Sequence, residues 1–382
     1  MNHRLGYKRK TRLWLRHYVV PFLMLFAPPP IAAAVSATSP VIFGLRASVY
    51  REIAPPFILL TLTSLFSAIA AYSSSTQGEV IESTKFFLMG CCLLAGTRIR
   101  TDFQNIQRLA LLLMLLVASW YLLAGGEDSE ASRGFLYPPD NNGSAIILYF
   151  LSLIVVENKK LFFRFLMMGL LFAFSTAVDS RTLLLLLPLF LLSQPISLSA
   201  SKILALLAIS IMAYFWATSV ELFGNWSDQV RLALYSTVLN YFASHGIDFI
   251  AAGQTQFIDT LNHSLPSFVA ARLEVDHAHN AFFHILGSYG LLALLCFIGA
   301  IYSLFRQSTI LRDQGLKFQI VLLFALMQIE TVITDSRITY VIFLFFGLQL
   351  GMAIRNKAPR PILTHSREVR AILSENAPAN RM

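Results

Sequence analysis

The sequence predicts an all-α protein that crosses a membrane many times. Hydrophobic residues make up 56% of its 382 residues, only 13% are charged, and the mean hydropathy is +0.62, more than the core of a soluble domain requires. A spanning helix needs about 20 mainly apolar residues, and such runs recur along this chain with short polar joints between them. The fold class is therefore a polytopic helical membrane protein.

The length rule predicts about twelve transmembrane helices. Pro28, Pro29 and Pro30 separate the first two, because proline cannot continue a helical hydrogen-bond ladder. The expected spans fall near residues 14–28, 30–45, 55–72, 80–97, 108–124, 142–156, 161–178, 182–194, 203–220, 281–304, 317–333 and 338–354. The chain then divides into a basic N-terminus (1–16), nine spans (17–220), one long loop (221–280), three spans (281–354) and a basic tail (355–382).

The distribution of cations predicts the orientation. With the N-terminus in the cytoplasm, 24 of the 30 Lys and Arg residues lie in cytoplasmic segments, as expected because these residues resist translocation in short loops. Both termini are then cytoplasmic, and residues 221–280 face the opposite side. The basic termini are expected to contact anionic membrane lipids, with no nucleic-acid partner. Lys85 lies inside an expected span.

The five remaining cations on the outer side are all arginines: Arg133, Arg181, Arg231, Arg272 and Arg337. A guanidinium group grips phosphate oxygens in a bidentate manner, whereas lysine acts as a flexible point charge, so this set suits an anionic phosphate ligand. Arg181 and Arg337 each stand where a span meets water, two residues after an aspartate. The alternatives are a chance distribution of arginines, or local Asp–Arg pairs that close the two hairpins.

The long outer loop is the expected location of the chemistry. It is too short for a separate catalytic domain but long enough to cover a cavity. Its middle, residues 227–247, has apolar residues at helical spacing and is predicted to form an amphipathic helix on the membrane surface. The segment holds or borders five of the eight histidines: His245, His263, His277, His279 and His284.

Residues 275–295, VDHAHNAFFHILGSYGLLALL, place His277 and His279 at the mouth of a span. Histidine has an unperturbed pKa of about 6.5, so at a wet entrance it can accept a proton from a hydroxyl group and release it again. The alternatives are a hydrogen-bonded interfacial histidine without a chemical role, or the beginning of a metal site formed with Asp276. No third ligand at a usual spacing is evident, so no metal or other cofactor is expected.

Several stretches together resemble the superfamily of O-antigen ligases and Wzy-type polysaccharide polymerases. The long loop ends in His279-Asn280, followed by Gly287 and Gly290 in the next helix. The similar stretches are RGFLYPPDNNGSAIILYF (133–150), DSRTLLLLLPLFLL (179–192) and QVR (229–231) with the helix and glycine-containing turn that follow it. The resemblance covers roughly residues 100–305.

This resemblance implies a membrane glycosyltransferase of the bacterial inner membrane with its active site facing the periplasm. The donor would be a glycan on undecaprenyl diphosphate, and the acceptor another carrier-linked glycan or the lipid A core. His279 would be the catalytic base, and Asn280 would orient it or bind sugar. The expected diphosphate- and substrate-binding residues also include Arg181, Arg231, Arg272, Arg337 and His277. Polysaccharide-assembly proteins are further expected partners.

Three functions stay open from the sequence. The compact long loop and the His-Ala-His-Asn segment resemble exopolysaccharide and O-antigen polymerases slightly more than O-antigen ligases, so the resemblance favours a polymerase slightly. A flippase for the same lipid-linked glycan is the alternative of another class. A flippase needs a cationic path across the membrane and gating breaks in paired helices, whereas the arginines here gather on the outer side.

Overall fold

A computed structural model describes most of the 382-residue chain. The described residues are 18–43, 50–73, 77–99, 101–124, 141–157, 159–177, 226–270, 275, 277, 278, 280–329 and 336–357. Their secondary structure is helical, with no strand in these ranges. The all-α prediction is confirmed for this part of the chain, while the expected spans 182–194 and 203–220 lie outside it.

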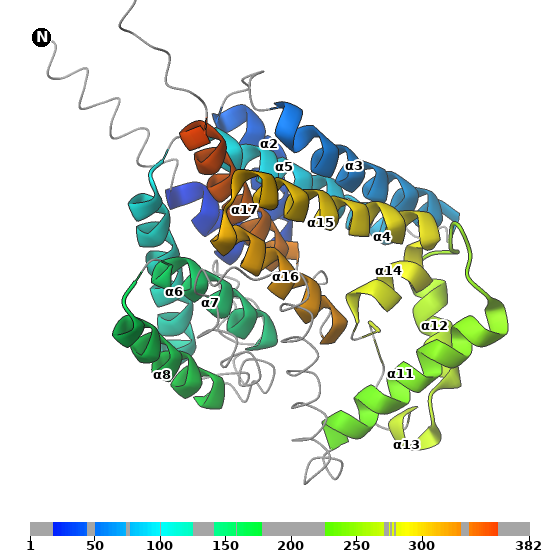
Figure 1. Ribbon diagram of the computed structural model, residues 1–382. Helices are drawn as coiled ribbons and strands as arrows, with labels where there is room; N and C mark the ends of the chain where they lie inside the picture. The colour runs from blue at the N-terminus through cyan, green and yellow to red at the C-terminus, as the bar shows by residue number, and fades with distance from the viewer. Residues whose placement is uncertain are drawn as a thin grey trace, which may run out of the picture.

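The helices form one main bundle with a smaller helical group beside it (Figure 1). Residues 18–26 are helical and precede the bundle helices, which are α2 (Pro29–Phe43), α3 (Tyr50–Ser73), α4 (Gln77–Ser83), α5 (Lys85–Arg98), α6 (Phe103–Ala124), α7 (Asn141–Val156), α8 (Leu161–Ala177), α14 (Ala281–Tyr289), α15 (Leu291–Leu311), α16 (Gln314–Ile329) and α17 (Ser336–Lys357). The smaller group contains α11 (Trp226–His245), α12 (Gln254–Ser264) and α13 (Ser267–Ala270).

Among the described residues, four helical segments are long and apolar enough to cross a membrane: Glu52–Tyr72, Phe103–Trp120, Leu291–Leu311 and Ser336–Lys357. Shorter apolar helices cover Pro29–Phe43, Gly143–Val156, Phe162–Phe174 and Gln314–Gln328. Large apolar side chains are exposed on α3, α6, α8 and α15, as a lipid-facing surface requires. The chain is thus a membrane-embedded helical protein, whereas the number of twelve spans and the orientation stay predictions.

Two expected spans are interrupted, which corrects the sequence analysis. The expected span 80–97 is divided at Thr84 into α4 and α5, and the expected span 281–304 is divided at Gly290 into α14 and α15. Gly290 has a φ of 93°, a conformation that favours glycine. The proline prediction is confirmed, because the helix of residues 18–26 ends before Pro28 and α2 begins at Pro29.

Glycines allow α5 and α17 to pack in parallel in the centre of the bundle. A side chain at Gly347 would collide with the Leu93 carbonyl oxygen, and one at Gly96 with that of Leu344. Small residues at such positions let helix backbones approach closely, which is how helices associate where lipid is as apolar as the side chains. Because α5 and α17 run in the same direction, their first residues, Lys85 and Ser336, lie at the same end of the bundle.

At the opposite end of the bundle, where α5 and α7 end, polar side chains form hydrogen bonds with backbone carbonyl groups. Arg355 donates hydrogen bonds to the carbonyl oxygens of Thr97 (3.0 Å) and Ile99 (3.2 Å), where α5 ends. Gln107 donates to the carbonyl oxygens of Val155 (3.0 Å) and Glu157 (2.9 Å), where α7 ends. Helix C-termini leave four carbonyls without intrahelical partners, so these contacts tie separate helices together where their own ladders stop.

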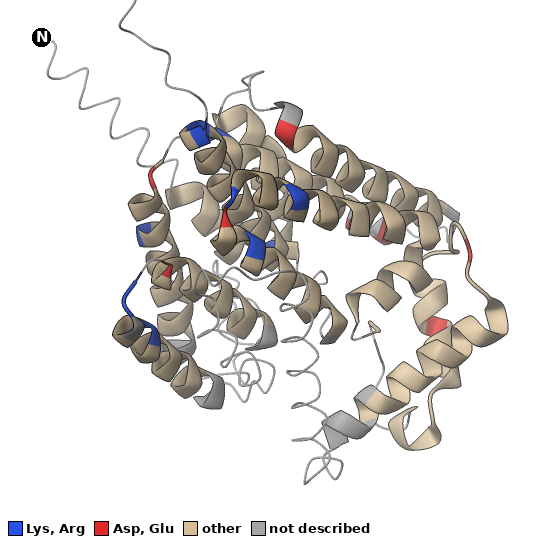
Figure 2. Cartoon of the chain, viewed as in Figure 1, with Lys and Arg blue, Asp and Glu red and all other residues tan. Residues whose placement is uncertain are grey.

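Figure 2 shows that the cations of the bundle gather towards this second end, near the finish of α15 and α17. By sequence, α12, α13 and α14 at the first end contain no Lys or Arg. The uneven distribution agrees in direction with the predicted orientation, in which the end of α17 faces the cytoplasm.

Replacing Gly347 by Ala is expected to destabilise the protein by about 1–3 kcal/mol, because the added methyl group forces α17 away from α5. Gly169 is the matched control, since a Cβ there meets no atom within 4 Å. Gly169→Ala should be neutral or stabilising by up to about 1 kcal/mol, as alanine is the better helix former. Thermal unfolding in detergent measures both variants, and equal stability of the two would contradict the packing account.

Glu157 predicts a pH dependence of stability. The pKa of this carboxyl group is raised from 4.5 to about 8, chiefly by burial and also by nearby Asp313, while Arg164 lowers it. The folded state therefore holds the proton more tightly than the unfolded state, and its stabilising effect is lost as the pH rises through about 8. Glu157→Gln should remove on the order of 2–4 kcal/mol of this dependence. The measurement is thermal unfolding between pH 5 and 9, and parallel curves for both proteins would refute the assignment.

Candidate active site

The segment from Val275 to Asn280 enters the bundle at the N-terminus of α14, and Asn280 fixes this entry. Its side-chain oxygen accepts hydrogen bonds from the backbone N–H groups of Phe282 (2.9 Å) and Phe283 (3.0 Å), so Asn280 is the N-cap of α14. Its side-chain nitrogen donates to the backbone carbonyl (2.9 Å) and side-chain oxygen (3.4 Å) of Gln328 on α16. These contacts use the whole hydrogen-bonding capacity of the amide and favour an orienting role over sugar binding.

Asn262 on α12 holds the other end of the segment. Its side-chain nitrogen donates to the carbonyl oxygen of Val275 (2.9 Å), and its side-chain oxygen accepts from the N–H group of the same residue (2.9 Å). Val275 and Ala278 are buried in a second apolar core, formed with Val230, Leu234, Val238, Phe257, Ile258, Leu261, Leu265 and Val269. The segment that contains His277 and His279 is therefore anchored on both sides.

The second core also corrects the interpretation of residues 227–247. They belong to a helix as predicted, α11, but Val230, Leu234 and Val238 face α12 and fill a core of their own. Leu232 and Leu239 are exposed on the same helix. The described part of residues 221–280 is thus a small packed unit, and any contact of α11 with the membrane surface stays a prediction.

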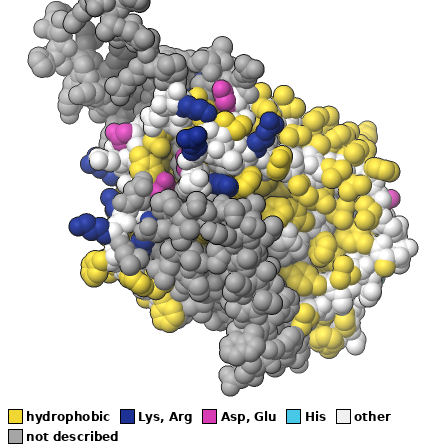
Figure 3. Space-filling model, viewed as in Figure 1, with side chains coloured by type: hydrophobic (Ala, Val, Ile, Leu, Met, Phe, Trp, Pro, Cys, Tyr) yellow, Lys and Arg dark blue, Asp and Glu magenta, His cyan; other side chains and the backbone are white. Residues whose placement is uncertain are grey.

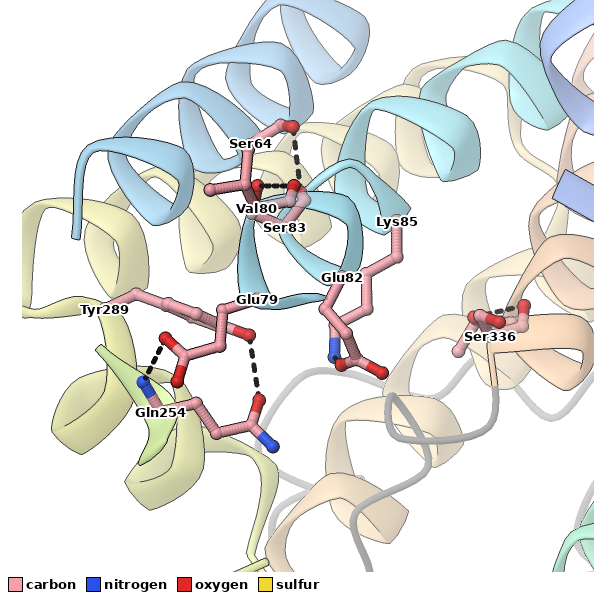
Figure 4. Close-up of polar contacts among 10 residues, drawn as sticks. Ser64, Glu79, Val80, Glu82, Ser83, Lys85, Gln254, Tyr289 and Ser336 are labelled. Atoms are coloured by element: carbon pink, nitrogen blue, oxygen red, sulfur yellow. Dashed lines mark hydrogen bonds and ion pairs between the residues drawn. The ribbon is translucent and has the colours of Figure 1, made fainter. Parts of the chain in front are cut away.

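Glu79 attaches this unit to the bundle. Its carboxylate accepts hydrogen bonds from the N–H groups of Gln254 (3.1 Å) and Thr255 (2.6 Å), the first residues of α12 (Figure 4). The N-cap position of α12 is Gly253, which has no side chain to satisfy these groups. A distant carboxylate therefore supplies the cap, and its negative charge also suits the positive end of the helix dipole. The Tyr289 hydroxyl donates to the side-chain oxygen of Gln254 (3.2 Å).

An ion pair between a buried lysine and an exposed glutamate lies next to this attachment, since the Glu82 side chain is 52% exposed. The Lys85 ammonium is 3.3 Å from the Glu82 carboxylate, and Lys85 is only 4% exposed. In the view of Figure 4 the pair stands between Tyr289 and Ser336, at the start of α17. Charges buried at membrane depth are costly and are retained at functional or packing sites. The cluster of Glu79, Glu82 and Lys85 on successive turns of α4 and α5 was missed from the sequence, although its spacing of three at the mouth of an apolar run was a usable signal.

The predicted arginines are only partly placed. Arg337 is buried in the first turn of α17 and interacts with neighbouring groups, although an aspartate partner at position 335 lies outside the described residues. Arg231 lies in α11, one helical turn before Tyr235, whose hydroxyl donates to the same Gln328 carbonyl that Asn280 contacts (3.4 Å). The Arg231 side chain, and all of Arg181 and Arg272, lie outside the described residues.

Of the predicted histidines, His277 is half-buried and in contact with neighbours, whereas His279 lies outside the described residues. The alternative metal site cannot be assembled from placed residues, because Asp276 is outside them as well. Within the described ranges, no group of three or more His, Cys, Asp or Glu side chains is arranged to hold a metal ion. The described geometry is therefore a segment held at Val275 and Asn280, with Lys85 and Arg337 buried at the same end of the bundle.

Comparison with protein-family models finds no family that matches this chain, and comparison with curated proteins finds no match either. The fold and the composition define the class: a helical, membrane-embedded protein with a polar cluster at one end of its bundle. Any more specific assignment is a proposal that depends on the residues themselves.

Asn262→Ala is expected to release the histidine segment without unfolding the bundle, because both backbone groups of Val275 lose their partner. Hydrogen exchange at residues 275–280 should accelerate about tenfold or more, while exchange in α15 and α17 stays slow. Ser264→Ala is the matched control in the same helix, where an exposed hydroxyl bonds only to Thr260. Unchanged protection at 275–280 in the Asn262 variant would show that the anchor is not needed.

Proposed function

We propose that this protein is a membrane glycosyltransferase of the O-antigen ligase and polysaccharide polymerase type. It transfers a glycan from undecaprenyl diphosphate to an acceptor hydroxyl group during cell-surface polysaccharide assembly. The acceptor oxygen attacks the anomeric carbon, the bond from that carbon to the phosphate oxygen breaks, and the hydroxyl proton passes to His279. The carrier leaves as undecaprenyl diphosphate, and the anomeric configuration is inverted.

The observation that carries the proposal is the anchoring of the histidine segment at the end of the bundle where Lys85 and Arg337 are buried. A general base must be held in place to act, and a leaving diphosphate needs fixed positive charge where its negative charge develops. The anchored segment and the two buried cations lie at the same end of the described bundle and support the proposal. The motif order around His279-Asn280 supports the same reaction by resemblance.

In this proposal the arginines bind the diphosphate. Arg181, Arg231 and Arg272 are assigned to its oxygens, and Arg337 supports the charge of the site from the start of α17. His277 is assigned to substrate binding beside the base. Asn280 positions His279 by capping α14. No metal ion or other cofactor is part of the reaction.

The proposed location is the bacterial inner membrane, with several spans and the site facing the periplasm. The acceptor is another carrier-linked glycan in a polymerase, which we favour slightly, and the lipid A core in a ligase. The glycan profile of a deletion strain separates the functions. Single repeat units on the core indicate a polymerase, carrier-bound polymer with bare core indicates a ligase, and glycan retained on the inner leaflet indicates a flippase.

His279→Ala should lower the rate of transfer by about 100-fold to 10,000-fold, because a general base typically contributes this much. Donor binding should persist, since arginines hold the diphosphate. His277→Ala serves as the comparison and should be milder. Turnover by purified protein with a lipid-linked glycan measures both. Near-normal turnover of the His279 variant would remove it from the mechanism, and loss of wild-type activity on chelation with rescue by zinc would favour the metal alternative.

Arg181→Lys and Arg231→Lys should each lose most of the activity although the charge is kept, because an ammonium group cannot reproduce a bidentate contact with phosphate oxygens. The same turnover assay, together with donor binding, tests this expectation. Arg108→Lys is the control, since this exposed arginine lies in α6 towards the opposite end of the bundle. Full activity of well-inserted Arg181 and Arg231 variants would reduce these residues to structural elements.

A further inference from the structure

A second cationic site lies at the opposite end of the bundle from the histidine segment. A cavity of about 610 Å³ opens there between the start of α6, the turn after α7, the first turn of α8, the turn between α15 and α16, and the end of α17. Its charged and amide-bearing walls include Glu157, Arg164, Arg312, Asp313, Asn356 and Lys357. Since α17 starts at the candidate active site and ends in this cavity, its 22 residues separate the two by roughly 30 Å.

The helices that end in the wall of the cavity indicate its level relative to the membrane. Phe103, Leu311 and Lys357 line it, and each is the first or last residue of a segment long and apolar enough to cross a membrane. Three such ends at one level mark the height at which the apolar bundle gives way to water. If these segments cross the membrane, lipid headgroups lie at this height and their phosphates are the nearest anions.

The charge of the cavity favours an anion. Three of its lining residues are basic and two are acidic. Asp313 is already engaged, since its carboxylate accepts a hydrogen bond from the N–H group of Leu316 (3.0 Å) and caps α16. Glu157 is largely protonated near neutral pH, because burial raises its pKa to about 8. The positive charge of the arginines and the lysine is therefore only partly offset.

All three basic residues line the cavity, and the Lys357 Nζ atom donates a hydrogen bond to the Ile310 carbonyl oxygen at 3.1 Å. Arg164 is almost fully buried, and its Nε atom donates to the Lys159 carbonyl oxygen at 3.4 Å. Arg312 ends α15 in a left-handed conformation with a φ of 57°, which turns the chain sharply at the cavity wall. Neither Arg312 nor Lys357 forms an ion pair with another described residue. Figure 3 shows Lys and Arg side chains gathered over this part of the surface.

We propose that this cavity binds a phosphate group at the membrane surface, supplied by the headgroup of an anionic phospholipid. Arg164, Arg312 and Lys357 hold the phosphate oxygens, and the amides of Asn356 and Gln314 can donate to the remaining polar groups of the headgroup. The bound lipid joins α8, the α15–α16 turn and α17 at the end where their own backbone ladders stop. The site does not depend on the glycosyltransferase proposal.

The test uses the purified full-length protein, freed of lipid in detergent and then exposed to phosphatidylglycerol or phosphatidylcholine. Native mass spectrometry measures the bound lipid. Arg312→Gln/Lys357→Gln should bind phosphatidylglycerol about tenfold or more weakly than the wild type, with phosphatidylcholine unaffected. Lys159→Gln/Lys160→Gln is the matched control, because it removes two exposed charges from the neighbouring turn that do not line the cavity, and it should stay within about twofold. If the double variant fails to fold, Lys357→Gln alone gives the comparison.

A second arm titrates inorganic phosphate against thermal unfolding of the same proteins. Competition of phosphate with phosphatidylglycerol in the wild type supports a phosphate site. Saturable phosphate binding that is lost in the double variant, without any preference for phosphatidylglycerol, would overturn the lipid source and indicate a soluble phosphate ligand. Equal lipid loss in the double variant and its control, or no preference between the two lipids, would overturn the site.

Discussion

The interruption of the helix at Gly290 is the constraint on which the candidate-site end of the bundle depends. An interrupted helix at membrane depth exposes backbone N–H groups that lipid cannot satisfy. Here the Leu291 and Leu292 N–H groups donate to the Asp248 (2.9 Å) and Phe249 (3.1 Å) carbonyl oxygens of the preceding loop. Gly290 permits this contact, because a Cβ there would stand 2.6 Å from the Phe249 oxygen. The long loop is thereby fixed onto the bundle at the point where the helix stops.

The same fixed unit explains why the candidate site is formed by residues far apart in the sequence. Glu79 caps α12 across 175 positions, and Asn262 at the far end of α12 holds Val275. The 11-residue helix α12 thus links the bundle, which holds its first residues, to Val275, which is held near its last residues. Asn280 then returns the chain to the bundle at Gln328. Such double attachment suits a base that must meet a bound donor, since small displacements of a catalytic group are costly.

Much of this arrangement could be predicted from the sequence, and the rest could not. Apolar runs gave the helices because spanning length is a local property. The asparagine before an apolar run also marks Asn280 as a cap, a signal that was not used when Asn280 was expected to orient His279 or to bind sugar. The helix interruption at Gly290 depends on carbonyl groups of residues 248–249. The cap of α12 depends on the Glu79 carboxylate. No local pattern contains such partners, so the second core and the Glu79 attachment required coordinates.

The account assigns different anions to the two ends of one bundle, with the diphosphate of the donor beside the histidine segment. A structure of the full-length protein with bound undecaprenyl diphosphate tests this claim most directly. We predict density for the diphosphate between the guanidinium groups of Arg181 and Arg231, with the His279 imidazole within hydrogen-bonding reach of an acceptor hydroxyl. Diphosphate density in the cavity lined by Arg312 and Lys357, with none near His279, would contradict the account.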